Sequence, residues 1–353
     1  MKVLVTAGGT GGHIMPAVAI AEAIVTGDPG ARILFVGTDR GMEERIAGLK
    51  GLDFIGITAL GIKGKSVTNL LGAVLVNTRA FLKALRIVRD FRPDWVIGTG
   101  GYVTGMVVLA GRITGSTCAI QEQNTIPGLT NRILARVAHR VYLSFPDALG
   151  RFPAARTRLV GNPLRRELTD MRTDGSGNSL LVLGGSLGAR SINRAVQQQL
   201  ESIEKSRVQL IWQTGKYYYE DIMAANAELN NKAILITDFI SRMDYAYALA
   251  DLVVSRAGAG SISEFALLGK AVLLVPSPNV AEDHQTQNAL ALVRKGAAVM
   301  ISDEEACEKL IPEALALLEQ PGRLQELRSA IKKMALPHAA EHIADEIIKL
   351  AKI

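Results

Sequence analysis

The sequence predicts an α/β protein with two parallel-sheet domains, and three observations support this. Short apolar runs alternate with longer helical segments along most of the chain, as in parallel strands joined by helical crossovers. Glycine-rich loops follow several of the predicted strands. A Gly-Asn-Pro run within 160–165 then interrupts the alternation, which afterwards starts again. We therefore expect one domain at 1–162 together with the final segment 338–353, and a second at 163–337.

Length and composition narrow the classes of function. A chain of 353 residues, 48% of them apolar, can bury the cores of about two domains. The net charge is +6 but aromatic residues are only 5%, so an anionic ligand or an anionic membrane surface fits better than nucleic acid. Cys118 and Cys307 are predicted to be free thiols of a reducing cytoplasm. No leader and no membrane-spanning segment is expected, because a strand begins at Lys2 and no apolar run reaches about 18 residues.

The first predicted strand, Lys2 to Thr6, runs into a loop with four glycines, Ala7 to His13, and then a helix from about Ile14 to Val25. Such a loop lets the backbone approach a phosphate or a sugar closely. Its glycine spacing is not that of a dinucleotide site, although Asp39 after the second strand keeps a nicotinamide oxidoreductase as an alternative. His13 is either a polar residue at the helix start or a general base or ligand contact.

Further strands of the first domain are predicted at Ile33 to Val36, Phe54 to Thr58, Asp94 to Gly98, Thr117 to Gln121 and Val141 to Ser144. A second glycine loop, Thr99 to Gly105, follows one of them, and another ends in the polar run Gln121 to Asn124. Open α/β sheets bind their ligands at the carboxyl ends of the strands, so this polar run is a candidate binding segment.

The segment Thr68 to Asp90 is predicted to be one helix. Its first part is apolar on all sides, and a basic stripe recurs further along at helical spacing. This combination fits contact with an anionic membrane, where each cation contributes about 1 kcal/mol. The predicted contacts are two apolar and three basic side chains, Leu71, Leu75, Arg79, Lys83 and Arg86. A core helix with an ordinary solvated face is the alternative.

The second domain repeats the same order of elements. Its strands are predicted at Ser179 to Leu183, Val208 to Trp212, Ala233 to Ile236, Asp251 to Val254, Ala271 to Val275 and Ala298 to Ile301. A third glycine loop, Gly184 to Ala189, and a helix over Arg190 to Ile203 follow the first of these. The last helix, His338 to Ala351, is expected to cross back onto the first domain.

The segment Ser255 to Asn288 carries the strongest binding pattern in the chain. Gly258 and Gly260 permit a tight turn into a helix over about Ser261 to Leu268, whose first N–H groups and positive dipole end suit a diphosphate. The polar cluster Ala281 to Asn288 suits sugar hydroxyls, because amides both donate and accept hydrogen bonds.

Three polar side chains at this helix start have predicted roles. Ser261 and Ser263 are cap-type residues. Glu264, expected in the first turn, is either a carboxylate favoured by the helix dipole or the acceptor of two hydrogen bonds from a ribose diol.

Together these motifs resemble one family over nearly the whole chain. The matching segments are Gly8 to His13, Gly100 to Val103, Glu122 to Asn124, Pro127 to Asn131, Gly184 to Ser186 and Gly188 to Arg190. The family is undecaprenyldiphospho-muramoylpentapeptide β-N-acetylglucosaminyltransferase, which makes lipid II from lipid I in bacterial peptidoglycan synthesis. The resemblance implies a GT-B fold, with two Rossmann-like domains facing a cleft.

The resemblance also implies the reaction and its partners. N-acetylglucosamine would move from UDP-N-acetylglucosamine to the C4 hydroxyl of the muramoyl residue of lipid I, with inversion, so one displacement assisted by one base suffices. No cofactor or metal is implied, and the sequence has no Asp-x-Asp motif to hold one. The protein would sit peripherally on an anionic membrane at the cytoplasmic face of the bacterial inner membrane, with other cell-wall synthesis proteins as candidate partners.

The resemblance further assigns roles to single residues. His13 would be the base, with Glu122 the next candidate. The residues implied to bind the donor are Arg165 and Ile240 at the uracil, Glu264 at the ribose, Ser186, Ala259, Gly260, Ser261, Ile262 and Ser263 at the diphosphate, and Gln285, Asn124, Thr10, Gly11 and Gly12 at the sugar. The acceptor diphosphate would lie over the first two glycine loops, at Gly9, Gly100, Gly101 and Tyr102.

Two departures from the family pattern limit what can be carried over. Gln121 stands where the family commonly has His, so no catalytic role rests on that position. Met106 stands where a proline is common in the second glycine loop, which weakens a detailed placement of the acceptor.

Two further functions remain as alternatives. A UDP-N-acetylglucosamine 2-epimerase shares the two-domain fold, but it needs acids around the sugar, where the first-domain loops offer mainly glycine and amides. A non-catalytic, membrane-anchored sugar-nucleotide-binding subunit would not need a complete donor domain in the same chain.

Overall fold

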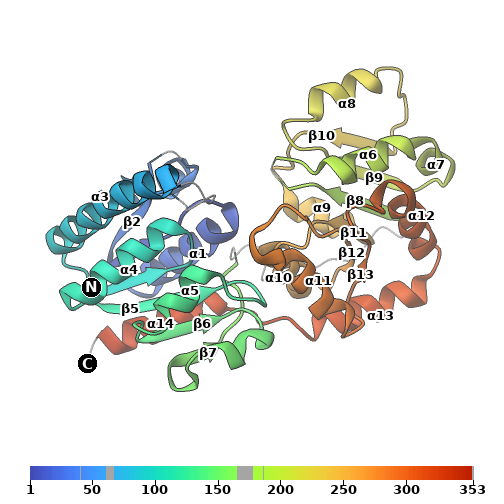
Figure 1. Ribbon diagram of the computed structural model, residues 1–353. Coiled ribbons are helices and arrows are strands. Elements are labelled where there is room, and N and C mark those ends of the chain that lie inside the picture. The colour runs from blue at the N-terminus through green and yellow to red at the C-terminus, as the bar shows by residue number, and fades with distance from the viewer. Residues whose placement is uncertain (40, 61–66, 165–177, 186, 352–353) are drawn as a thin grey trace. The chain divides into compact units, whose positions relative to one another are not determined.

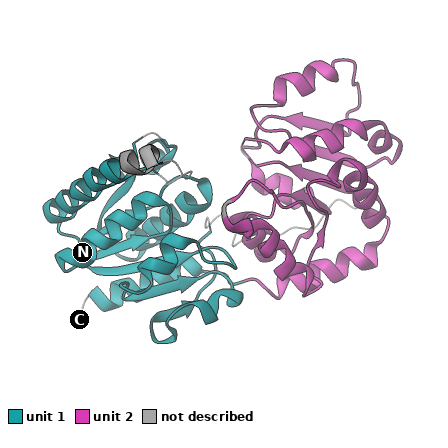
Figure 2. Cartoon of the chain, in the orientation of Figure 1, with its two compact units in different colours: residues 1–165, 336–353 teal, residues 166–335 magenta. Residues whose placement is uncertain are grey.

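The chain forms two compact units, which Figures 1 and 2 show for the computed structural model. The structure describes residues 1–39, 41–60, 67–164, 178–185 and 187–351, without the side chains of 67–73 and 281. Unit 1 comprises Met1–Arg165 and Leu336–Ile353, and unit 2 comprises Arg166–Ala335. Three predicted site residues, Arg165, Ser186 and the side chain of Leu71, therefore lie outside the described part.

Unit 1 is built on a parallel sheet with the strand order β3-β2-β1-β4-β5-β6-β7. Its strands are β1 (Lys2–Thr6), β2 (Arg32–Thr38), β3 (Asp53–Ile57), β4 (Trp95–Gly98), β5 (Thr117–Glu122), β6 (Arg140–Leu143) and β7 (Thr157–Leu159). Side chains alternate between the two faces, so Leu4 enters one core cluster while Val3 and Val5 enter the other. Both faces are buried, as the nearly continuous apolar strands predict.

Helices cover both faces of this sheet. They are α1 (Gly11–Gly27), α2 (Glu43–Leu49), α3 (Val67–Phe91), α4 (Tyr102–Thr114), α5 (Leu129–Leu134) and α14 (Ala339–Ala351), with 3-10 turns η1 (Pro146–Arg151) and η2 (Ala154–Arg156). On one face α4 packs between α3 and α5 (Figure 1). On the other, Ile343 and Ile347 of α14 join the cluster that contains Ile20 of α1. The last helix therefore returns to the first unit, as predicted.

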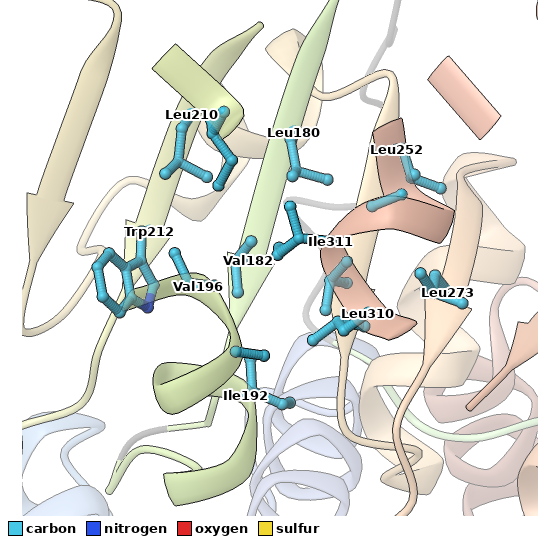
Figure 3. Close-up of a cluster of buried hydrophobic side chains, with 14 of the residues drawn as sticks. Leu180, Val182, Ile192, Val196, Leu210, Trp212, Leu252, Leu273, Leu310 and Ile311 are labelled. Atoms are coloured by element: carbon cyan, nitrogen blue, oxygen red, sulfur yellow. The ribbon is translucent and has the colours of Figure 1, made fainter. Parts of the chain in front are cut away.

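Unit 2 has a second parallel sheet, in the order β10-β9-β8-β11-β12-β13. Its strands are β8 (Ser179–Leu183), β9 (Gln209–Gln213), β10 (Ile234–Thr237), β11 (Leu252–Ser255), β12 (Ala271–Leu274) and β13 (Val299–Met300). Its helices are α6 (Arg190–Gln198), α7 (Leu200–Lys205), α8 (Tyr219–Ala225), α9 (Met243–Leu249), α10 (Ala259–Leu268), η4 (Ala281–Asp283), α11 (His284–Val293), α12 (Ala306–Leu318) and α13 (Pro321–Lys332). Leu180, Val182 and Trp212 pack against α6 and α12 in the core of Figure 3.

The predicted elements and the structure differ in a few places. The three-residue strand β7 and the short helix α2 were not predicted, because neither is long enough to show a periodic pattern. The single helix expected over 190–203 is two helices, α6 and α7, separated at Gln199. Helices α1 and α10 begin at Gly11 and Ala259, earlier than expected, and this changes how their first residues are used.

Two properties of the chain follow from burial and helix composition. Both cysteines are free, as predicted, and burial raises the pKa of the Cys118 thiol to about 12. This thiol therefore stays protonated and unreactive at neutral pH. Within the described ranges, no helix combines the length and the apolar character needed to cross a membrane.

Candidate functional site

The first candidate site lies at the carboxyl ends of β1 and β4 in unit 1. The strand order changes direction between these two neighbours, and open α/β sheets bind ligands at such a switch point. The Gly8 N–H donates to the Gly100 carbonyl oxygen at 3.1 Å, which joins the two glycine loops directly. At Gly101, where φ is +93°, an added Cβ would lie 2.3 Å from the Gly8 oxygen. Only glycine fits there, because the two backbones are in contact.

His13 lies in the first turn of α1, not at the end of a loop as expected, because the helix already begins at Gly11. Its Nδ1 atom is 2.9 Å from Oε1 of Gln123. The ring packs against Gly100, where an added Cβ would lie 2.6 Å from Nδ1. The Thr99 hydroxyl donates to the His13 carbonyl oxygen at 2.8 Å. The imidazole is therefore positioned by three segments that follow β1, β4 and β5.

The other predicted residues of the first glycine loop, Thr10 to Gly12, lie at the start of α1, where backbone N–H groups have no acceptor within the helix. Thr10 is the N-cap of α1, makes no side-chain cap and is exposed, as is Gly12. The N–H groups of Gly11 and Gly12 lie in the first turn, where an α-helix provides no internal acceptor. These N–H groups can therefore donate to a ligand at the switch point.

The N–H of Gly9 has a hydrogen-bond partner within unit 1. Its N–H donates to Oε1 of Glu43 at 3.1 Å, and the Thr38 hydroxyl donates to the same oxygen at 2.8 Å. Glu43 is only 1% exposed, so a buried carboxylate accepts from the N–H of Gly9, one of the residues expected at the acceptor diphosphate. Of the other residues expected there, Gly100 and Gly101 form the joint between the loops, and the Tyr102 side chain is 53% exposed.

Glu122, the second candidate for the base, holds the loop after β5. It is 1% exposed. One oxygen accepts from the backbone and side-chain nitrogens of Asn124, at 2.9 and 3.1 Å. The other accepts from the Gly128 N–H at 3.1 Å and the Asn131 amide at 2.9 Å. Both carboxylate oxygens of Glu122 are therefore occupied by hydrogen bonds from residues 124–131, and the geometry favours His13 over Glu122 as the proton acceptor. The same hydrogen bonds orient Asn124, the predicted sugar contact.

The second candidate site lies at the corresponding switch point of unit 2, after β8 and β11. Gly188 closes the third glycine loop with φ +89°, and an added Cβ would lie 2.2 Å from the Thr214 oxygen. Gly258 is the N-cap of α10, and no side chain caps this helix. The predicted serine caps are wrong, since the helix begins at Ala259 and the Ser263 hydroxyl donates to the Ala259 carbonyl oxygen at 2.8 Å.

The early start of α10 reduces the set of diphosphate donors. The Ile262 N–H donates to the Gly258 oxygen at 3.0 Å, so it is part of the helix. The N–H groups of Ala259, Gly260 and Ser261 precede that bond and are oriented out of the helix end. Glu264 lies beyond the first turn, so the predicted stabilisation of its carboxylate by the helix dipole is wrong. That carboxylate instead accepts from the Tyr247 hydroxyl at 2.8 Å.

Gln213 connects two parts of this second site. It is 3% exposed at the carboxyl end of β9, its Nε2 donates to the Gly185 oxygen at 3.0 Å, and its Oε1 accepts from the Ile240 N–H at 3.1 Å. The third glycine loop and the predicted uracil contact are therefore held together by one side chain. The sequence interpretation missed Gln213, although a polar residue at the end of a buried strand is a signal that could have identified it.

The polar cluster at the start of α11 is partly structural. The Gln285 Oε1 accepts from the Ser277 N–H at 2.9 Å, so its amide nitrogen is the group that can face a sugar. Asn288 is fully buried and its amide donates to the Ala257 oxygen at 3.3 Å, which links α11 to the turn before α10. Among the residues that the structure describes, no three His, Cys, Asp or Glu side chains are grouped to hold a metal ion.

Helix α3 has a buried face and an exposed face. Ala84 and Val88 pack into the core, whereas Leu75 is 55% exposed and Leu82 is 59% exposed. Arg79, Lys83 and Arg86 are exposed, and Lys83 also donates to the Gly56 oxygen at 2.7 Å. The neighbouring helices expose further large apolar side chains, Leu109, Ile113, Leu129 and Ile133.

Two family models match the chain and together cover most of it. The glycosyltransferase family 28 N-terminal domain matches residues 3–143, and the glycosyltransferase family 28 C-terminal domain matches residues 179–343. The chain belongs to glycosyltransferase family 28. The first matched range lies within unit 1, and the second covers most of unit 2 and the first part of the segment 336–353 of unit 1.

Two curated relatives of this family 28 chain are named UDP-N-acetylglucosamine–N-acetylmuramyl-(pentapeptide) pyrophosphoryl-undecaprenol N-acetylglucosamine transferase. The protein from Parabacteroides distasonis is 42% identical over 99% of this chain and 98% of its own length. The protein from Bacteroides thetaiotaomicron is 44% identical over 100% of this chain and 98% of its own length. The resemblance predicted from the glycine loops is thereby confirmed.

Solved structures agree with the family 28 assignment. The crystal structure of Acinetobacter baumannii MurG has a TM-score of 0.79 and 31% identity, and the alignment covers 99% of both chains. This confirms the predicted GT-B fold. A UDP-GlcNAc 2-epimerase from Neisseria meningitidis has a TM-score of 0.64 at 13% identity, which shows a shared fold alone.

Proposed function

We propose that this family 28 enzyme transfers N-acetylglucosamine from UDP-N-acetylglucosamine to the C4 hydroxyl of the muramoyl residue of lipid I, which gives lipid II. The observation that carries the proposal is the His13 imidazole held at the first switch point, in a chain whose full-length relatives bear this transferase name. The two units then bind the two substrates, the acceptor in unit 1 and the sugar nucleotide in unit 2.

The donor is held by unit 2 through its diphosphate and its nucleoside. The first N–H groups of α10 and the positive end of its dipole bind the diphosphate and stabilise the negative charge that develops on the leaving UDP. Glu264, oriented by Tyr247, accepts hydrogen bonds from the ribose diol. The Gln213 contact sets the position of Ile240 at the uracil.

The acceptor reacts at unit 1. His13 removes the proton of the C4 hydroxyl as the oxygen attacks the anomeric carbon, the bond from that carbon to the diphosphate breaks, and UDP leaves with its electron pair. One displacement inverts the anomeric carbon from the α to the β configuration, so no carboxylate nucleophile is needed. In unit 1, Thr10 to Gly12 and Asn124 are the proposed contacts of the transferred sugar, and Gly100 to Tyr102 lie against the acceptor diphosphate.

The lipid anchor of the acceptor requires the enzyme to reach a membrane. The exposed apolar side chains of α3, α4 and α5, with Arg79 and Arg86 beside them, fit an anionic surface. The enzyme would then be a peripheral protein of the cytoplasmic face of the inner membrane, near other cell-wall synthesis proteins.

A single assay tests the reaction against its main alternative. The purified chain is incubated with UDP-N-acetylglucosamine and a short-chain lipid I analogue, and the products are separated and their masses measured by mass spectrometry. We expect the analogue to gain one N-acetylhexosamine and UDP to appear in equal amount. Formation of the C2 epimer of the sugar, which has the same mass as the donor sugar and is detected by NMR, with no gain on the analogue would instead establish an epimerase.

The membrane contact is tested by charge reversal of Arg79 and Arg86 together, with reversal of the exposed unit 2 residues Arg194 and Lys232 as the matched control. We expect only the α3 variant to sediment less with anionic liposomes at about 0.1 M salt, where the Debye length is about 10 Å. It should also lose more turnover on bilayer-embedded acceptor than on the short-chain analogue. Equal losses on both acceptors would make α3 an ordinary solvated helix.

A further inference from the structure

We propose that Gln123 is a positioning residue that fixes the tautomer of His13, with the proton on Nδ1 and the lone pair on Nε2. The inference rests on the proposed function, in which His13 takes a proton from the acceptor. A neutral imidazole carries one proton on one of its two nitrogens, and the hydrogen bond at one nitrogen decides whether the other can act as a base.

The orientation of the Gln123 amide is determined by its surroundings. Gln123 is 2% exposed, and its Nε2 donates to the Thr99 carbonyl oxygen at 2.7 Å and to the Gln121 carbonyl oxygen at 3.3 Å. It also donates to the side-chain oxygen of Gln121, whose own nitrogen donates to the Ser144 hydroxyl at 2.8 Å. All three partners of the Gln123 nitrogen are acceptors, so that end of the amide must be the NH₂ group.

The opposite end of the amide is therefore an oxygen, and this oxygen faces His13. It lies 2.9 Å from Nδ1, and because it has no proton, Nδ1 must donate. Turning the amide over would place its oxygen against the three acceptors and leave buried polar groups unpaired, at about 1–3 kcal/mol for each. The Nε2 lone pair of His13 is thus kept for the acceptor hydroxyl.

The His13 ring is held in its contact with Gln123 by two neighbouring residues. Gly100 presses against it, and Thr99 both accepts from the Gln123 amide and donates its hydroxyl to the His13 carbonyl oxygen. Gln121 and Gln123 are neutral at every ordinary pH. They set the tautomer without adding a negative charge that would favour the protonated ring.

The first test reads the tautomer itself, independently of turnover. Long-range proton–nitrogen correlation spectra of protein labelled with ¹⁵N at its five histidines assign His13 by comparison with His13→Asn. We expect the wild-type spectrum to show a protonated Nδ1 and a bare Nε2, and the isosteric variant Gln123→Met to gain the Nε2–H form. A wild-type Nε2–H tautomer would overturn the proposal, even if no variant folds, and so would a Gln123→Met tautomer identical to the wild type.

The second test separates positioning from general support of the fold. We expect Gln123→Met to lower kcat by about 10- to 100-fold, part of what a general base contributes, with the KM for UDP-N-acetylglucosamine unchanged. Gln213→Met, the matched buried amide of unit 2, should raise that KM instead. The double variant that combines Gln123→Met with His13→Ala should have the same kcat as His13→Ala alone. If the two losses of kcat multiply in the double variant, Gln123 acts independently of His13.

The two tests also distinguish this inference from the function it rests on. If His13→Ala keeps wild-type turnover, the proposed base is wrong while the tautomer measurement still stands. If His13→Ala is slow but the Gln123 variant keeps both its tautomer and its rate, the base is right and the positioning role is wrong.

Discussion

The two switch points share one backbone plan but present different chemical groups. At the first, α1 begins at Gly11 and brings the His13 side chain into its opening turn, where Gln123 holds it. At the second, α10 begins with Ala259, Gly260 and Ser261, so the helix start presents backbone N–H groups and the positive end of the helix dipole. The comparison shows that the residue in the first helical turn, and not the fold, decides whether such a site offers a titratable side chain or a phosphate cradle.

The glycines of the two sites differ in the same way. Gly101 is needed by the protein itself, because its φ is +93° and a Cβ would meet the Gly8 oxygen. At Gly260 an added Cβ would have no neighbouring atom within 4 Å and φ is not positive, so the free protein does not require glycine there. Glycine at this position is therefore expected to serve the proposed ligand and not the fold.

The largest expected effect separates chemistry from donor binding. His13→Ala should lower kcat by about 10² to 10⁴, as for loss of a general base, and leave the calorimetric affinity for UDP nearly unchanged. Single-turnover kinetics with saturating donor measures the first, and titration of the free enzyme measures the second. A parallel loss of UDP affinity would mean that the first switch point also binds the nucleotide.

The complementary change is at the second site. Glu264→Ala should weaken UDP-N-acetylglucosamine binding by roughly 1.5 to 3 kcal/mol, because the ribose loses hydrogen bonds to a charged acceptor. Tyr247→Phe removes only the hydroxyl that orients this carboxylate, so it is the control and should weaken binding less. Unchanged calorimetric affinity in Glu264→Ala would remove Glu264 from the ribose site.

Substitution of Gly101 and Gly260 by alanine then tests whether each glycine is needed for folding or for ligand binding. Gly101→Ala should destabilise the protein by about 1–3 kcal/mol or more through its positive φ and the clash with Gly8. Gly260→Ala should leave the melting temperature unchanged or slightly higher, since alanine favours a helix by up to about 1 kcal/mol, yet it should weaken UDP binding. Normal UDP affinity in Gly260→Ala would show that the diphosphate lies elsewhere.

The smallest expected effect concerns metal removal. Because the leaving diphosphate is assigned to the start of α10, turnover on a soluble acceptor should be the same before and after treatment with EDTA. A large loss of turnover that magnesium restores, with unchanged solubility of the acceptor, would mean that a cation and not the helix dipole stabilises the leaving diphosphate.

Much of this architecture was predictable from local pattern. The buried strands β1 and β8 have the predicted bounds, since continuous apolar runs flanked by glycine are a strong signal in parallel sheets. The glycine loops and the Glu-Gln-Asn run at the end of β5 are local sequence features that indicate the family. Helix starts were less predictable, because a helix that begins in a glycine loop has no side-chain cap to mark it.

By itself the sequence determined the two-sheet fold, the family and the positions of the glycine loops, because apolar runs and glycine spacing are local properties. Only the tertiary structure decided which groups face one another. His13 and Gln123 are 110 residues apart, and Glu43 reaches Gly9 across 34. These contacts exist because the parallel sheet brings the carboxyl ends of β2, β1, β4 and β5 to one edge. Hydrogen bonds between distant side chains depend on that register, which no local pattern encodes.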